Sequence, residues 1–250
     1  MLLPAQALSL PHVRHGFTTR AGGVSRGALG SLNLARRPAE REEHLVENWR
    51  RVSAALGART EDLVLSSQVH GRRVLEVERG TGPLAVVGEC DALVTTTPGL
   101  VLATRAADCV PVLLATRAAP RPGVAAVHSG WRGTALGVVE AAVDALCAAS
   151  GARPAALVAA IGPCISGEAY TVGPEVVAAL RDQAGLAPES FLLPGPRVDL
   201  GAAVAAQLRR AGVEEVERLA CCTVGDERFF SHRREGDATG RFAGVIRLAA

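Results

Sequence analysis

Short runs of hydrophobic residues dominate the middle of the chain. They occupy residues 63–65, 74–77, 92–94, 100–103, 110–114, 124–127 and 157–161. Apolar runs of this length, bounded by turn residues, are typical of buried strands. Similar stretches at residues 12–19 and 242–248 predict two more strands. Together these segments predict a substantial sheet.

The segment from residue 41 to 56 shows a different period. Leu45, Trp49 and Val52 recur at intervals of three and four residues, with charged residues between them. This spacing places the apolar side chains on one face of a helix. Gly57 follows as a stop signal. The segment therefore predicts an amphipathic helix.

Three further helices are predicted, over residues 134–149, 174–181 and 200–210. The first is predicted as a single helix with Leu136 on its apolar face. Asp199 precedes the third as an N-cap. Because strands come in blocks with only some helices between them, the pattern predicts an α+β fold of mixed β-sheets packed with flanking helices. A chain of 250 residues suits a single domain over residues 1–250, since single cores grow to about 250 to 300 residues.

The charge balance and the length of the apolar runs each argue against one class of partner. All 27 basic residues are arginine, and with 25 acidic residues they leave a formal net charge of only +2. Nucleic-acid binders more typically combine a basic excess with interleaved aromatic residues, whereas this chain is 3% aromatic. No apolar run approaches the roughly 20 residues of a spanning helix. We expect neither a nucleic-acid nor a membrane partner.

The six cysteines contain no CxxC pair, which argues against a zinc ribbon or a disulfide scaffold. Reduced thiols and the absence of a basic signal-peptide start predict a cytoplasmic protein. Cys164 follows a predicted strand and is either a nucleophile or a packed turn residue. Cys221 and Cys222 would point in opposite directions on a strand, so we assign them to packing.

Three chemically reactive side chains stand at the ends of apolar runs. They are His70, Cys109 and His128. Two imidazoles and one thiolate suit tetrahedral zinc, and three protein ligands leave a fourth position for water or substrate. The alternative is that Cys109 packs as a small apolar residue and each histidine satisfies a local hydrogen bond. Their spacing matches no local motif and leaves both interpretations open.

The segment 129–133 follows His128 and leads directly into a predicted helix. Free backbone N–H groups and the positive end of a helix dipole bind anions, and Arg132 would add a formal charge. Phosphate would suit such a site. The alternative is that Gly130 and Gly133 only allow the chain to turn.

These segments together resemble the YfiH-like family, long labelled multicopper polyphenol oxidase or laccase domain and reinterpreted as zinc-dependent purine nucleoside phosphorylases. The resemblance spans most of the chain. Its motifs are His15-Gly16-Phe17-Thr18-Thr19-Arg20-Ala21-Gly22-Gly23-Val24-Ser25, Ser31-Leu32-Asn33-Leu34, Gln68-Val69-His70-Gly71, Asp91-Ala92-Leu93-Val94-Thr95, Ala107-Asp108-Cys109-Val110-Pro111, His128-Ser129-Gly130-Trp131-Arg132-Gly133-Thr134, Ile161-Gly162-Pro163-Cys164-Ile165, Phe230-Ser231-His232-Arg233-Arg234 and Thr239-Gly240-Arg241.

The resemblance implies that His70, Cys109 and His128 are the metal ligands and the catalytic centre. The family usually has alanine after the last histidine, whereas this chain has Ser129, a small change that should not disturb ligation. The resemblance also implies phosphorolysis of adenosine, inosine and S-methyl-5′-thioadenosine, with deamination of adenosine at the same site. The partners would then be purine nucleosides and phosphate, and the cofactor Zn²⁺.

Further residues suit substrate binding in such an enzyme. Arg20, in a turn with glycines, is the first candidate for holding phosphate, and Arg132 is the second. Asn33, Gln68 and Asp91 are candidates for positioning the substrate.

Three alternatives remain. A multicopper oxidase needs many clustered imidazoles, but the chain has only six histidines and no HxH pair, so phenol oxidation would be a side activity of copper bound at the same donors. A cysteine hydrolase would use Cys109 or Cys164, activated by His128, to cleave an amide or ester, with cell-wall metabolism as a context. A binding module would take a nucleoside or a partner protein without turnover.

Overall fold

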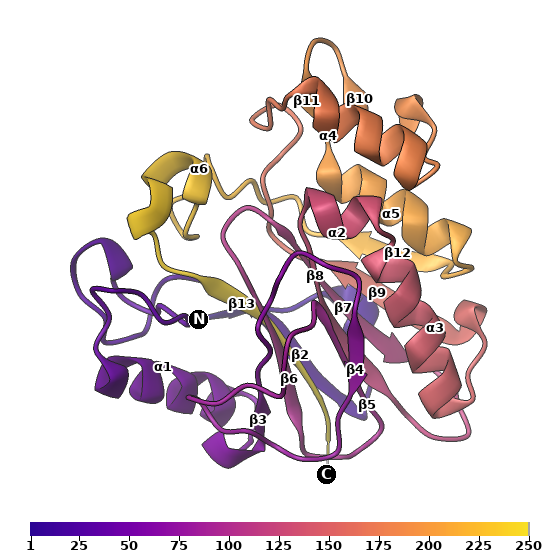
Figure 1. Cartoon of the computed structure of the whole chain (residues 1–250). Coiled ribbons are helices and arrows are strands. Elements are labelled where there is room, and N and C mark those ends of the chain that lie inside the picture. The colour runs from indigo at the N-terminus through magenta and orange to yellow at the C-terminus, as the bar shows by residue number, and fades with distance from the viewer. Residues whose placement is uncertain (250) are drawn as a thin grey trace.

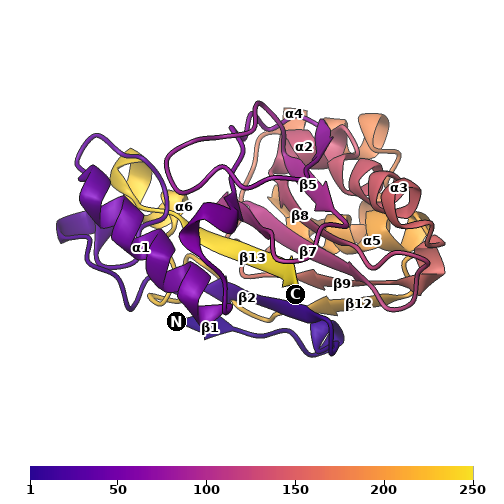
Figure 2. The ribbon, with the colours of Figure 1, turned by 90° about the horizontal axis from the view of Figure 1, so that it is seen from below.

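The apolar runs form two β-sheets that face each other, and helices cover the outer face of each sheet (Figure 1). The computed structural model describes residues 1–249. Figure 2 shows the layers from below, with helix α1 on one side and helices α2, α3 and α5 on the other. The expected α+β class, with mixed sheets, flanking helices and a single domain, is confirmed.

The larger sheet has six strands, in the order β12-β9-β7-β8-β5-β4. Their bounds are β4 Val74–Glu76, β5 Ala92–Thr95, β7 Val110–Thr116, β8 Val124–Ser129, β9 Leu157–Ile161 and β12 Glu215–Arg218. Strands β5, β7, β8 and β9 are buried along their whole length. Both faces of this sheet are covered, which is why these strands read as continuous apolar runs.

The second sheet has five strands, in the order β1-β2-β13-β6-β3. Their bounds are β1 Leu2–Leu3, β2 Val13–Thr18, β3 Leu63–Val64, β6 Val101–Ala106 and β13 Phe242–Leu248. Strand β13 pairs with both β2 and β6, so Gly244 lies opposite Phe17 on one side and Thr104 on the other. A separate pair joins β10 Leu192–Leu193 and β11 Arg197–Val198.

Six α-helices are present in residues 1–249, with short 3₁₀ turns between elements. The helices are α1 Glu42–Ala55, α2 Trp131–Ala135, α3 Val138–Ser150, α4 Pro174–Ala178, α5 Leu200–Arg210 and α6 His232–Glu235. The 3₁₀ turns cover Gln6–Leu8, Gly27–Leu29, Thr60–Asp62, Pro154–Ala156, Pro188–Ser190 and Gly236–Ala238. None of these helices is long and apolar enough to cross a membrane.

The alternation of side chains along each strand builds three large cores, and a fourth, smaller cluster gathers around Phe229, Phe230 and Phe242. Between the sheets, Phe17, Leu102 and Ile246 of the smaller sheet share a core with Leu113 and Ala126 of the larger one. The outer face of the smaller sheet packs on Leu45, Trp49 and Val52 of α1, and α3 and α5 cover the outer face of the larger sheet. Each fully buried side chain of this size stabilises the fold by about 1.5 to 3 kcal/mol.

The predicted strands and the helices over residues 41–56 and 200–210 are confirmed within a few residues. Asp199 caps α5 through its side chain, which accepts a hydrogen bond from the N–H of Ala202. The predicted helix 174–181 is α-helical to Ala178 and continues as a wider π-helical turn, Ala179–Gln183. The pattern did not predict the very short strands β1, β10 and β11.

The prediction of one helix over residues 134–149 is wrong. The chain forms α2 and α3, separated at Gly137, whose φ of +78° lies in the left-handed region. Glycine adopts this conformation without steric cost, and an α-helix cannot continue through it. Leu136, predicted on the apolar face, is 44% exposed. The break shortens α2 to a single turn directly after His128 and Ser129.

Candidate active site

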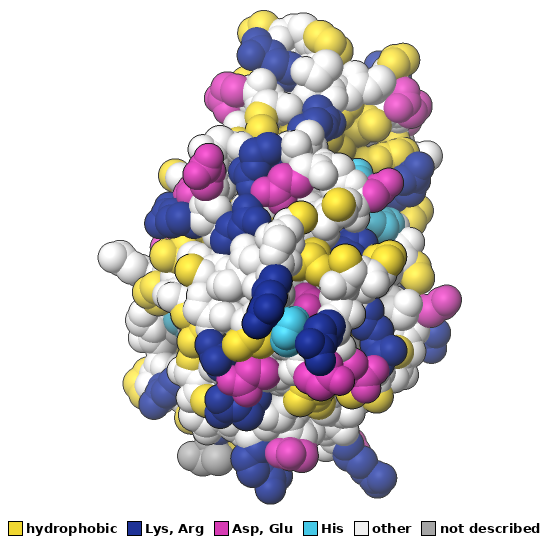
Figure 3. Space-filling view, turned by 90° about the vertical axis from the view of Figure 1, so that its left-hand side faces the viewer, with side chains coloured by type: hydrophobic (Ala, Val, Ile, Leu, Met, Phe, Trp, Pro, Cys, Tyr) yellow, Lys and Arg dark blue, Asp and Glu magenta, His cyan; other side chains and the backbone are white. Residues whose placement is uncertain are grey.

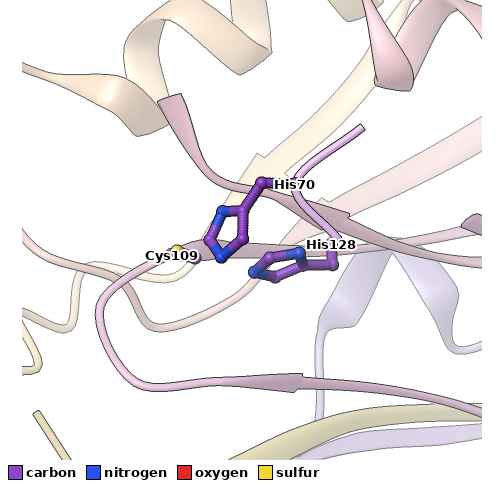
Figure 4. Close-up of side chains that lie close together, drawn as sticks. All are labelled: His70, Cys109 and His128. Atoms are coloured by element: carbon purple, nitrogen blue, oxygen red, sulfur yellow. The ribbon is translucent and has the colours of Figure 1, made fainter. Parts of the chain in front are cut away.

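His70, Cys109 and His128 come together at one end of the larger sheet (Figure 4). One ligand atom from each residue, the two imidazole nitrogens and the thiol sulfur, lies within 4.8 Å of the other two. The two imidazole rings meet edge to face, with centroids 4.8 Å apart. We refer to these three residues as the ligand trio.

Strand pairing explains how residues so far apart in sequence meet. Strand β7 pairs with β8 so that Pro111 lies opposite His128 and Val110 lies opposite Ser129. Cys109 directly precedes β7 and therefore arrives beside the end of β8. His70 lies in the loop before β4, at the far side of β5.

Asp91 joins the two histidines. Its side chain is fully buried, and Oδ1 accepts a hydrogen bond from Nδ1 of His128 at 2.8 Å. The carboxylate also accepts the backbone N–H groups of Val69, His70 and Gly71, at 3.2, 3.0 and 2.7 Å. Because Nδ1 of His128 is occupied, Nε2 is left as the ligand atom, as in carboxylate–histidine–metal arrangements.

Backbone strain is concentrated at the ligand trio. His70 has a φ of +59° and Asp108, directly before Cys109, has a φ of +91°. Residues other than glycine rarely adopt these φ values, which persist where surrounding contacts enforce them. Asp108 is fixed by the hydroxyl of Thr223 at 2.6 Å and the N–H of Arg233 at 2.6 Å. The strain orients His70 and Cys109 toward His128.

The pKa values of the two histidines are set by burial and by neighbouring charges. Burial alone would lower the pKa of His128, but the thiolate of Cys109 and the Asp91 carboxylate outweigh it and raise the pKa to about 9. The pKa of His70 is lowered, by burial and then by the nearby His128. His70 is therefore neutral near pH 7, the form in which imidazole binds a metal.

The space between the trio fits a metal ion. A Cβ atom at Gly130 would lie 2.5 Å from Nδ1 of His70 and 3.2 Å from Sγ of Cys109, so only glycine leaves this side open. Two nitrogen donors and one sulfur donor match the preference of Zn²⁺, and copper also binds such sets. Gly130 thus has a role beyond the turn that the sequence suggested.

The trio lies in the wall of a cavity of about 660 Å³. Gln68 and Arg132, both expected near substrate, also line it. The amide of Gln68 makes two hydrogen bonds of 2.8 Å to the backbone of Arg105, one to the carbonyl and one from the N–H. Gln68 therefore ties the loop of His70 to β6.

Five arginines line the cavity, and Arg132 and Arg233 are two of them. The other three, Arg37, Arg105 and Arg241, were not predicted to bind substrate. We call them the cavity arginines. Burial and then Arg37 lower the pKa of Arg105, and the same two causes lower that of Arg241 to about 10. Nη2 of Arg37 is buried without a hydrogen-bond partner. No cavity arginine forms a salt bridge with a carboxylate of residues 1–249, so the group concentrates positive charge that an anion could balance.

One signal for this group was present in the sequence. Arg105 interrupts the apolar run of β6, and a charge inside a buried strand is uncommon without a function or a partner. Arg37 lies in a polar loop and carries no comparable signal, and Arg241 was marked only by the motif Thr239-Gly240-Arg241.

Three residues expected to contact substrate, Arg20, Asn33 and Asp91, do not line the cavity. Asp91 instead holds His128 and the loop of His70. Nη1 of Arg20 donates to Glu235 at 2.8 Å, and the Arg20 guanidinium lies 4.5 Å from the ring centre of Phe230. Asn33 is fully buried, and its Oδ1 accepts the N–H of Arg241 at 2.9 Å. Asn33 thus positions the backbone of a cavity arginine.

Aromatic side chains form another part of the cavity wall. Trp131 and Tyr170 both line it. The guanidinium of Arg132 lies 4.3 Å from the ring centre of Trp131, and that of Arg233 lies 5.2 Å from that of Tyr170. Burial raises the pKa of Tyr170 to about 12, so it stays neutral. The rings offer flat surfaces on which a planar group could stack.

Cys164 does not line the cavity. It is buried, and burial raises the pKa of its thiol to about 12. A nucleophilic cysteine needs a lowered pKa and access to substrate. Of the two cysteines considered as nucleophiles, only Cys109 meets the cavity.

Comparison with known proteins places these features in context. Residues 14–249 match a family model described as multi-copper polyphenol oxidoreductase laccase. A purine nucleoside phosphorylase of Deinococcus radiodurans is 41% identical over 249 residues, covering 99% of this chain and 92% of that protein. Purine nucleoside phosphorylases of Streptomyces coelicolor and Mycobacterium tuberculosis are 40% and 39% identical, over 93% and 94% of this chain and 94% and 91% of theirs.

Solved structures share the fold. The protein YlmD of Geobacillus stearothermophilus superposes with a TM-score of 0.89 at 34% identity, covering 98% of this chain and 94% of that one. The hypothetical protein YfiH of Bacillus licheniformis gives a TM-score of 0.87 at 32% identity, covering 96% and 98%.

Proposed function

The chain belongs to the laccase-like YfiH family, and from this premise we propose that it is a zinc-dependent purine nucleoside phosphorylase that also deaminates adenosine. The proposed substrates are adenosine, inosine and S-methyl-5′-thioadenosine, with phosphate as co-substrate. The carrying observation is the position of the ligand trio and the cavity arginines in the wall of one cavity. Named relatives at 37% to 41% identity support the phosphorylase activity.

We propose that the cavity arginines hold the phosphate. Phosphorolysis requires a phosphate oxygen to attack C1′ of the ribose while the bond from C1′ to the purine nitrogen breaks. Guanidinium groups bind phosphate oxygens bidentately and can orient such an attack. This assignment replaces Arg20, whose charge is partly offset by Glu235. Arg132 stays a secondary contact at the cavity.

The remaining residues would position the nucleoside and the metal. His70, Cys109 and His128 would hold Zn²⁺, and Asp91 and Gln68 would fix the loop of His70. A bound Zn²⁺ supplies Lewis acidity and lowers the pKa of a water molecule that it binds. Trp131 and Tyr170 would contact the purine ring. Deamination would use the same cavity with water in place of phosphate.

The proposed partners are therefore small molecules. Figure 3 shows basic and acidic side chains mixed across one face of the molecule, without a continuous basic stripe on that face. Every cysteine in the structure is free, which supports the cytoplasm as the proposed location. Copper at the same donors would give phenol oxidation only as a side reaction.

The experiment combines metal content with product analysis on adenosine. We expect one zinc per chain, inosine as the product in phosphate-free buffer, and adenine with ribose 1-phosphate in phosphate buffer. Cys109→Ala should abolish zinc binding and both reactions, while Cys147→Ala, at a half-buried cysteine outside the cavity, should abolish neither. Zinc-loaded protein that shows neither base release nor deamination on any of the three nucleosides would refute the proposal.

A second function has one specific observation in its favour. The imidazole of His128 contacts Cys109 on one side and Asp91 on the other. A cysteine hydrolase arranges its nucleophile, base and orienting acid in the same order. Such an enzyme would lose activity on thiol alkylation after its metal had been removed without effect. The zinc enzyme would instead lose activity on chelation and regain it when zinc is added.

A further inference from the structure

Cys164 and Cys222 lie directly opposite each other in a short parallel pairing outside the main strands. The N–H of Cys164 donates to the carbonyl of Cys221 at 3.3 Å, and the N–H of Thr223 donates to the carbonyl of Cys164 at 3.0 Å. Paired residues on adjacent strands have Cα atoms about 5 Å apart and side chains on the same face. This separation lies in the range that a disulfide spans.

The two thiols have opposite surroundings. Cys222 is half-buried, and its sulfur accepts the N–H of Ser166 at 3.4 Å. Burial alone would raise its pKa, but hydrogen bonds from the hydroxyl and N–H of Ser166 and the N–H groups of Gly225 and Val224 outweigh it and lower the pKa. Cys164 is buried and stays a thiol. A thiol with a lowered pKa next to a second cysteine is typical of oxidation-sensitive pairs.

We propose that Cys222 and Cys164 form an oxidation site that reacts with hydroperoxides. The thiolate of Cys222 attacks the terminal oxygen of the hydroperoxide, the O–O bond breaks, and the alkoxide or hydroxide leaves with a proton from solvent. Cys222 is then a sulfenic acid. The sulfur of Cys164 attacks this sulfur, the S–O bond breaks, and the Cys164 proton passes to the departing hydroxyl, which leaves as water. A disulfide forms, so that two thiols are oxidised and one hydroperoxide is reduced.

The pair is connected to the ligand trio through Asp108. Thr223, next to Cys222, donates its hydroxyl to Oδ1 of Asp108 at 2.6 Å, and the N–H of Ile165, next to Cys164, donates to the carbonyl of Asp108 at 3.0 Å. Asp108 has a strained backbone and directly precedes Cys109. We expect the disulfide to shift these contacts and to lower nucleoside turnover, a consequence that rests on the proposed function.

The test begins with the native, zinc-loaded protein and needs no activity assay. Alkylation followed by peptide mapping should show Cys222 reacting at least about tenfold faster than Cys147 and Cys221. These two are matched controls, because both are half-buried and have raised pKa values. Equal rates for the three thiols would overturn the proposal.

Treatment with hydrogen peroxide gives the second readout. Peptide mapping should find Cys164 joined to Cys222, and Cys221→Ser should leave this link intact. In Cys164→Ser the sulfenic acid of Cys222 should accumulate and be trapped by a cyclic 1,3-dione. If this variant does not fold, Cys222→Ser provides the test in its place, because Cys164 should then stay reduced under the same peroxide treatment.

Oxidation of Cys164 that persists in Cys222→Ser would also overturn the site, as would the absence of the link in protein whose other cysteines become oxidised. These outcomes are independent of nucleoside chemistry. The oxidation site can therefore fail while the phosphorylase activity holds, and the reverse is equally observable.

Discussion

The protein contains two groups of arginines, and only one group forms salt bridges with a carboxylate. Arg20 and Arg234 both donate to Oε1 of Glu235, at 2.8 and 2.7 Å, and Thr239 donates to the second oxygen. We call these two the paired arginines. The cavity arginines, Arg37, Arg105 and Arg241, have no such partner in residues 1–249.

The difference separates two uses of the same residue type. In the paired group Glu235 offsets part of the positive charge, and the side chains hold α6 against the turn that follows β2. In the cavity group the charges repel one another, and burial adds to the cost, as the lowered pKa values of Arg105 and Arg241 show. A protein keeps such an arrangement where an anion relieves it. The contrast predicts catalytic defects from one group and stability defects from the other.

The largest expected effect is at the buried cavity arginine. Arg105→Ala should lower kcat/KM for phosphate by about 100- to 1,000-fold, since an oriented charge-stabilising donor is lost. Deamination of adenosine should be retained, because it uses water. Parallel product assays in phosphate and phosphate-free buffer measure both. Equal losses in the two reactions would place Arg105 in nucleoside binding or folding instead.

Arg20→Ala should give the opposite result. Loss of the charge-assisted bond to Glu235, in a setting where both side chains are about 22% to 23% exposed, should lower the free energy of unfolding by about 2 kcal/mol. Chemical denaturation measures this value. Phosphorolysis by the folded protein should persist. A selective loss of phosphorolysis with unchanged stability would mean that Arg20 binds phosphate. The two groups of arginines would then not differ in function.

Phosphate itself should distinguish the groups by binding. At ten times its Kd, phosphate should raise the free energy of unfolding by about 1.4 kcal/mol. The stabilisation should be absent in Arg105→Ala and present in Arg20→Ala, as thermal melting can show. Equal stabilisation of both variants would mean that phosphate binds at neither group.

The smallest effect is expected at Arg132. Its side chain is exposed and rests on the ring of Trp131, so its charge is screened by solvent. Arg132→Ala should raise KM for phosphate by about fivefold or less, the range of a surface charge. The effect should shrink as salt is added. A much larger, salt-independent loss would make Arg132 part of the anion site.

The sequence predicted the strands well because each lies in a layer that is covered on at least one face, so that periodicity reports burial directly. It could not predict the break at Gly137, since a glycine inside an apolar helical pattern is compatible with either a continuous helix or a left-handed turn. The ligand trio was found because histidine and cysteine carry distinctive chemistry and family motifs surround them.

The arginines were harder to assign for a physical reason. Arg20 and Arg241 both stand near glycines, in segments that resemble the same family. They differ only in neighbours supplied by the fold, Glu235 for Arg20 and the other cavity arginines for Arg241. A salt bridge between residues so far apart in sequence leaves no local sequence pattern. The sequence therefore predicted Arg20, rather than Arg241, as the phosphate-binding residue.

The central position of strand β13 also determines when the smaller sheet can form during synthesis of the chain. Strand β2 leaves the ribosome early, yet its neighbour β13 is made 227 residues later, counting from Phe17 to its partner Gly244. At cellular rates of synthesis this interval is roughly 10 to 45 seconds. During that time β2, and later β6, each lacks its β13 neighbour and exposes an open edge to other chains or chaperones. Arg241 directly precedes β13, so the wall of the cavity is complete only after β13 has joined the sheet.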